Sequence, residues 1–80
     1  MRVSIRLNAS LRRYIPSDKG GSPFPLEVED GATVATVMSQ LGIPHRQAQM
    51  VTVDGEQADV DAVLAEDQEL SLFPPLAGGC

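Results

Sequence analysis

The sequence has a single cysteine, Cys80, and no apolar run near the roughly 20 residues that cross a bilayer. One cysteine excludes a disulfide framework within the chain and any four-cysteine metal or iron–sulfur site. The first six residues include Arg2 and Arg6, which interrupt the apolar segment that a secretory signal needs. These absences predict a soluble, cytoplasmic protein with no membrane partner.

Basic residues are also scarce. Six lysines and arginines stand against eleven acids, which gives a formal net charge of −5. Nucleic acid is not expected as a partner, because phosphate binding depends on clustered Lys and Arg. Five of the six bases precede residue 20, and ten of the eleven acids follow it. The acids either form a solvated surface or steer the protein toward a basic partner, and we favour the first explanation.

The groups of a self-contained enzyme are missing as well. His45, the only histidine, follows Pro44 in a connector and has no nucleophile or second metal ligand at a useful spacing. Asp59 and Asp61 are paired carboxylates, but nothing completes a calcium loop around them. We therefore expect no catalytic residue, no metal and no bound cofactor.

Short stretches of alternating apolar and polar residues indicate half-buried strands. The predicted strands are 3–7, 24–28, 50–53, 56–58 and 70–73. A loop at 16–23 joins the first two, and Asp54-Gly55 is a turn typical of a hairpin between the next two.

Residues 33–41 form the one clear helix, because their apolar residues recur at i, i+3, i+4 and i+7. Thr33 or Asp30 is its N-cap, and Gly42 ends it.

Two connecting segments and the last strand carry weaker patterns. The pattern of segment 9–14 fits either a short helical turn or a loop. Segment 59–64 is predicted to be a short helical turn that buries Val63 or Leu64. On strict alternation, residues 70 and 72 point into the core, and Ser71 and Phe73 point out.

The order of elements predicts an α+β fold of two layers, with one helix on a mixed sheet of four to five strands and the last strand parallel to the first.

The end of the chain differs in character from the rest. We divide the protein into a domain, 1–76, and a flexible tail, 77–80, because Gly78 and Gly79 have maximal backbone freedom. The tail residues are Ala77, Gly78, Gly79 and Cys80. At its base lie the apolar residues Phe73, Pro74, Pro75 and Leu76. They form either a docking surface for a partner or, through Phe73, a cover for the edge of the domain's own sheet.

The same residues carry a resemblance to a known family. The opening strand 3–7, the helix start Thr33-Val34, the hairpin turn 53–55 and the ending 70–79 are similar to the ubiquitin-like sulfur-carrier family. Within it, the Phe-Pro-Pro and Gly-Gly of the ending most resemble the small subunit of molybdopterin synthase. This resemblance implies the β-grasp, or ubiquitin-like, fold.

The resemblance also implies a carrier in place of an enzyme. In this family an E1-like activating enzyme uses ATP to adenylate the terminal glycine carboxylate, here that of Gly79. Sulfur then replaces the adenylate, and the resulting thiocarboxylate donates its sulfur inside a synthase subunit. The implied product is the pterin cofactor of molybdenum or tungsten, or a related sulfur metabolite.

Cys80 departs from the family pattern, because it makes the Gly79 carbonyl part of an amide. Removal by a C-terminal processing peptidase is the explanation we rank first; sulfur held on Cys80 itself and an incidental extension are the others. A second function stays open, in which the same tail and sheet face serve a ubiquitin-like protein modifier or a noncovalent binding module.

Overall fold

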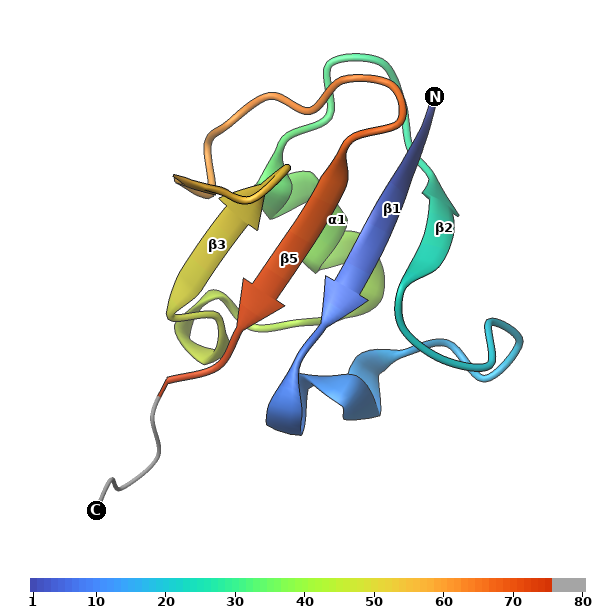
Figure 1. The fold of residues 1–80 in the computed structure, drawn as a ribbon, viewed down its shortest axis with the longest axis vertical. Helices are drawn as coiled ribbons and strands as arrows, with labels where there is room; N and C mark the ends of the chain where they lie inside the picture. The colour runs from blue at the N-terminus through green and yellow to red at the C-terminus, as the bar shows by residue number, and fades with distance from the viewer. Residues whose placement is uncertain (76–80) are drawn as a thin grey trace.

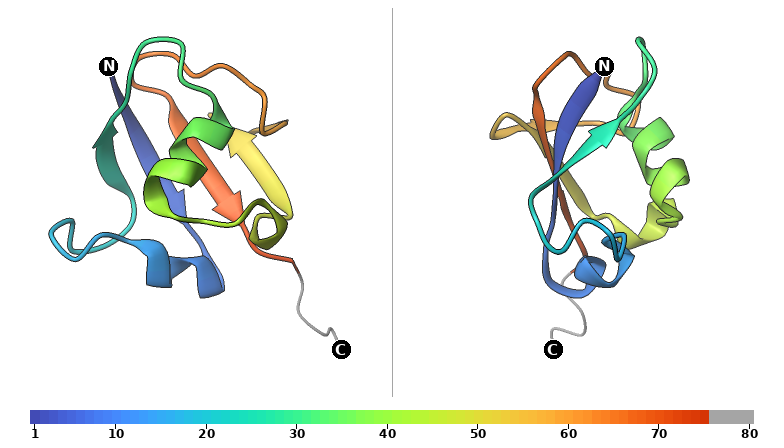
Figure 2. Two further views of the ribbon diagram at one scale, coloured as in Figure 1. Left: turned by 180° about the vertical axis from the view of Figure 1, so that it is seen from behind. Right: turned by 90° about the vertical axis from the view of Figure 1, so that its right-hand side faces the viewer.

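The computed structural model describes residues 1–75. Within them, five strands form one mixed sheet, and one α-helix packs across one face of it (Figures 1 and 2). The strands are β1 (Arg2–Leu7), β2 (Phe24–Glu27), β3 (Met50–Val53), β4 (Glu56–Ala58) and β5 (Glu69–Phe73). The helices are α1 (Val34–Leu41) and two short 3₁₀ helices, η1 (Ala9–Tyr14) and η2 (His45–Gln47).

The last strand in the sequence lies in the middle of the sheet, whose order is β2-β1-β5-β3-β4. β5 pairs in parallel with β1, where Ile5 is opposite Leu70. It pairs antiparallel with β3, where Val51 is opposite Leu72. The hairpins β1–β2 and β3–β4 complete the sheet. The β-grasp arrangement predicted from the sequence is therefore confirmed, with five strands.

The core lies between α1 and the face of the sheet that it covers. Period-two burial on the central strands and a helical stripe on α1 meet there, as the sequence indicates. The fully buried side chains of this layer are Val3, Ile5, Val34, Val37, Met38, Leu70 and Leu72. Each such side chain stabilises the fold by roughly 1.5–3 kcal/mol relative to an exposed position, so this layer provides most of the stabilisation.

Thr33, and not Asp30, caps the start of α1. The Thr36 N–H donates to the Thr33 hydroxyl at 3.2 Å, and the Thr33 N–H donates to the Thr36 hydroxyl at 3.2 Å. These two reciprocal bonds satisfy N–H groups that the helix itself leaves unpaired. Gly42 ends the helix with a φ of 78°, in the left-handed region that favours glycine. Ile43 then turns back and is buried.

We expect the substitution Thr33→Ala to lower the free energy of unfolding by about 1 kcal/mol, because it removes one cap acceptor. Thr33→Ser keeps the hydroxyl and is the matched control. Urea denaturation followed by far-UV circular dichroism measures the difference. Equal midpoints for Thr33→Ala and the wild type would show that the cap contributes no stability.

The helical turn predicted at 59–64 is wrong. Residues 59–62 form a single turn, closed by the Ala62 N–H donating to the Asp59 carbonyl at 3.0 Å, but no helix forms. An isolated bridge between Thr33 and Val63 follows the turn. The backbone N–H of Leu64 donates to the Ala32 carbonyl at 2.9 Å, and the Ala62 carbonyl accepts from the Val34 N–H at 3.1 Å. Because these groups bond to residues at the start of α1 and just before it, they are not free to form helical bonds. Leu64 is buried, whereas Val63 is 66% exposed.

Segment 9–14, which the sequence left open, is the 3₁₀ helix η1. Leu11 anchors it in the core with no exposed surface. Residues 16–23 lead from η1 to β2 without a helix or strand, as their composition indicates.

Candidate functional site

The backbone of β5 is held on both sides at its last two residues, one residue on each side. The Asn8 side-chain amide donates to the Leu72 carbonyl at 2.9 Å. On the other side, the Gln49 N–H donates to the Phe73 carbonyl at 2.8 Å. The chain therefore leaves the sheet at a fixed point, directly before Pro74. Figure 1 shows this point at the end of β5, close to η2.

The two 3₁₀ helices flank this exit. A guanidinium nitrogen of Arg13, from η1, donates to the side-chain oxygen of Gln47, from η2, at 3.2 Å. A surface pocket of about 270 Å³ lies beside them. Its lining residues are Ser10, Arg46, Gln47, Pro74 and Pro75. The pocket thus joins both helices to the base of the tail.

The structure places three of the four predicted docking residues at this exit. Phe73 and Pro74 are half-buried, and Pro75 is exposed. Leu76, the fourth, lies outside the described residues. So do Ala77, Gly78, Gly79 and Cys80, together with the predicted boundary between domain and tail. Whether the docking residues contact a partner stays a prediction.

Phe73 lies on the face of the sheet opposite α1, because it alternates with the buried Leu72. In register with Phe73 on β3 is Met50, whose side chain is 46% exposed. Neither faces the core, so the apolar surface at the tail base includes Met50, which sequence analysis did not single out. The signal was present, since Met50 precedes the inward-facing Val51 and must point outward.

Ser71 was expected to point outward, and by alternation it does, yet only 7% of its surface is exposed. It stands on the central strand with Arg6 and Thr52 at the same register on its two neighbours. A small side chain between two larger ones is covered by them. Ser71 therefore points outward, as predicted, without being exposed.

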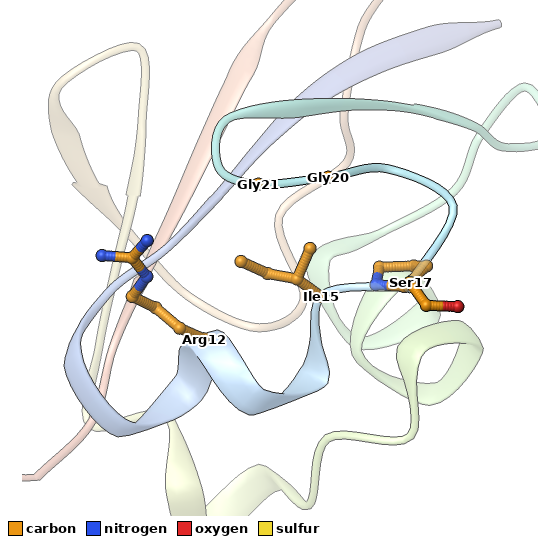
Figure 3. A pocket seen from close by; sticks show the side chains of 6 residues that line it. Arg12, Ile15, Ser17, Gly20 and Gly21 are labelled. Carbon is orange, nitrogen blue, oxygen red and sulfur yellow. The ribbon is translucent and has the colours of Figure 1, made fainter.

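A second pocket, of about 300 Å³, lies beside the loop after η1 (Figure 3). Arg12 and Ser17 stand on opposite sides of it, with Ile15 between them. Gly20 and Gly21 line it as well. This arrangement brings no base to the Ser17 hydroxyl, so it gives the serine no means of activation.

His45 lies in η2 and is exposed. Within residues 1–75, no three His, Cys, Asp or Glu side chains are grouped as metal ligands would be. The same part of the chain contains no helix with the length and apolar character needed to cross a bilayer.

A family model described as Mut7-C ubiquitin matches residues 1–77. The chain belongs to this family. The match spans the whole sheet, α1 and the exit of β5, so this Mut7-C ubiquitin domain has the ubiquitin-like character that its sequence predicts. A comparison with curated protein sequences gave no match.

Solved structures of two Haloferax volcanii proteins are similar to this chain over nearly its whole length. The small archaeal modifier protein SAMP1 of Haloferax volcanii is 25% identical with a TM-score of 0.72, over 99% of this chain and 100% of SAMP1. The HVO 2177 protein of that organism is 27% identical with a TM-score of 0.74, over 99% and 87%.

A protein from Pyrococcus furiosus assigned as molybdopterin converting factor, subunit 1, is 19% identical with a TM-score of 0.70, over 95% of this chain and 99% of that one. At that identity the likeness shows the fold alone. Together the family model and the likeness to SAMP1 confirm the resemblance to the ubiquitin-like sulfur-carrier family.

Proposed function

We propose that this protein is a sulfur carrier whose reactive group is the carboxylate of Gly79. A partner of the E1-like class transfers AMP from ATP to that carboxylate and releases pyrophosphate. A hydrosulfide-level donor then attacks the carbonyl carbon, AMP leaves, and a thiocarboxylate remains. A carboxylate is a poor electrophile, and attached AMP gives it a good leaving group. The chain supplies the reactive end and the docking surface, and its partners supply catalysis.

The observation that carries this proposal is the anchoring of β5. The strand that leads to Gly78-Gly79 is central. It is bonded as far as Leu72 on the β1 side and as far as Phe73 on the β3 side, and two prolines follow it. Each proline fixes φ near −65° and favours an extended chain before it. A rigid body that ends in this way suits delivery of a slender peptide to a site on another protein.

The acceptor that we favour is a synthase subunit in the assembly of the pterin cofactor of molybdenum or tungsten. The sequence Phe73-Pro74-Pro75 before Gly78-Gly79 supports it by its resemblance to such carriers. Cleavage of the Gly79–Cys80 bond by a peptidase is part of the proposal, since adenylation needs a free carboxylate at Gly79.

Two versions of the chain test the proposal: one that ends at Gly79 and one that retains Cys80. Each is incubated with ATP, sulfide and the E1-like enzyme of the same genome, without a peptidase. We expect intact-mass spectrometry to detect the exchange of one oxygen for sulfur only in the chain that ends at Gly79. Absence of this exchange in both chains would contradict the carrier function, and exchange on the chain that retains Cys80 would contradict the need for cleavage.

The alternative is a protein modifier, which the likeness to SAMP1 favours. In that case the Gly79 carboxylate, once activated, forms an isopeptide bond to a lysine of another protein. Cells that express an epitope-tagged chain distinguish the two functions. The modifier function would be supported, and the carrier function contradicted, by lysine-linked conjugates that are lost when the E1-like enzyme is deleted, in cells where no thiocarboxylate is detected.

A further inference from the structure

The acidic residues gather at one end of the sheet. Ten of the eleven acids belong to the segments 27–30, 54–61 and 66–69. One backbone hydrogen bond of 2.8 Å joins each segment to the beginning of β1 or β5. The Val28 N–H donates to the Met1 carbonyl, the Asp54 N–H donates to the Glu69 carbonyl, and the Asp67 N–H donates to the Arg2 carbonyl. Since β1 and β5 are parallel, their beginnings lie at the same end. β5 ends, at Phe73, at the other end of the sheet.

Three arginines occupy that other end. Arg12 and Arg13 belong to η1, which follows the end of β1, and Arg46 belongs to η2, which precedes β3. All three are exposed. Their separation in the sequence hides the cluster, which we call the basic end. Figure 1 shows η1 and η2 on the side where β5 ends.

The basic end differs from the other arginines in its partners. Arg2 pairs with Glu27 at 3.1 Å, and Arg6 pairs with Glu69 at 3.2 Å. Within residues 1–75, no carboxylate lies within ion-pair distance of the arginines of the basic end. The eleventh acid, Asp18, is in the following loop beside Lys19. The charge of the basic end is therefore available to another molecule.

Two contacts hold part of the basic end in place. The Arg13 guanidinium lies over the Tyr14 ring, 5.2 Å from its centroid, and donates to Gln47 at 3.2 Å. Arg46 lines the same pocket as Pro74 and Pro75. Positive charge thus stands beside the chain at the point where the tail begins.

We propose that the basic end docks on an acidic protein surface that surrounds the opening through which a partner receives the tail. This inference rests on the carrier function proposed above and specifies the chemistry of its partner. It argues against the alternative, weighed but not favoured above, that the acids steer the protein toward a basic partner. A basic partner would bind the acidic end of the sheet. The base of the tail would then lie on the side of the protein away from that partner.

The electrostatic argument sets the size of the effect. Charges at the contact act over a Debye length of about 8 Å at physiological ionic strength. Complementary patches raise association rates by about 10- to 1,000-fold at low salt. The separation of charge orients the approaching protein as well, because the acidic end is repelled by the surface that attracts the basic end.

The test uses a triple variant, Arg12→Gln, Arg13→Gln and Arg46→Gln, in a chain that ends at Gly79. We expect its association rate with the E1-like enzyme, measured by stopped flow, to fall about 10-fold at low salt and to approach the wild-type rate at high salt. The single variant Arg46→Gln, which disturbs none of the contacts of Arg13, should show part of the loss. The matched control neutralises three exposed acids of the other end: Glu56→Gln, Asp59→Asn and Asp61→Asn. It should not slow association.

A second measurement is independent of the carrier chemistry. The ¹⁵N-labelled protein is titrated with a short polyglutamate peptide, a polylysine peptide and a single-stranded oligonucleotide. We expect polyglutamate to shift the amide resonances of residues 12, 13 and 46, and the triple variant to lose these shifts.

Three results would overturn the inference: equal association rates for the triple variant and the wild type, polyglutamate shifts elsewhere, or tighter binding of the oligonucleotide than of polyglutamate at the basic end. A wild-type chain that acquires no sulfur but shows the expected shifts would contradict only the carrier function.

Discussion

Replacing Gly79 with valine is expected to abolish thiocarboxylate formation, with a loss of about 100-fold or more in rate. A branched side chain on the residue that is adenylated crowds the approach of ATP and of the sulfur nucleophile to the same carbonyl. The substitution is made in a chain that ends at residue 79. Intact-mass spectrometry over time, with the E1-like enzyme, ATP and sulfide, measures the rate.

The control for this substitution is Gly21→Val. An added Cβ at Gly21 meets no atom within 4 Å, and its backbone is not in the left-handed region. The control should therefore fold and acquire sulfur at the wild-type rate. If the Gly79→Val chain acquired sulfur as fast as the control, the last glycine would not be the activated residue.

Leu70→Ala is expected to have the largest effect on stability, a loss of about 3 kcal/mol in the free energy of unfolding. Leu70 has no exposed surface and lies on the central strand, where the lost side chain leaves a cavity against α1. Small domains have total stabilities near the lower end of about 5–15 kcal/mol, so the variant should retain only a small margin. Urea denaturation followed by far-UV circular dichroism measures the change.

Val63→Ala serves as the comparison, since Val63 is 66% exposed. Its effect should stay within about 0.5 kcal/mol. A Leu70→Ala variant with the same urea midpoint as Val63→Ala would contradict the packing described for β5.

Local patterns were enough to predict the elements whose contacts repeat with a fixed period. The stripe on α1 and the alternation on β1 follow from burial on one side. The connection at 59–64 could not be predicted in this way. Its backbone bonds go to residues 32–35, which lie far away in the sequence, and such pairing leaves no local signal.

In the candidate site too, residues adjacent in the sequence could be predicted, and residues that only the fold brings together could not. The sequence pointed to Phe73-Pro74-Pro75 as the base of the tail, because those residues are adjacent and apolar. It could not reveal the basic end. Arg13 and Gln47 are 34 positions apart, and only the contact between η1 and η2 brings their helices together. Charge counted along the chain shows only that acids predominate after residue 20, whereas the fold places them at the end of the sheet away from the exit.

The central place of β5 also affects how the protein is made. The strand that joins both halves of the sheet is the last of the described strands to leave the ribosome. Until it emerges, the β1–β2 hairpin and α1 lack the neighbour that covers their apolar faces, and a lone hairpin is only marginally stable in water. Translation that stops before Glu69 therefore leaves an open chain for cellular proteases. Only polypeptides synthesised through to the root of the tail should survive to meet a partner.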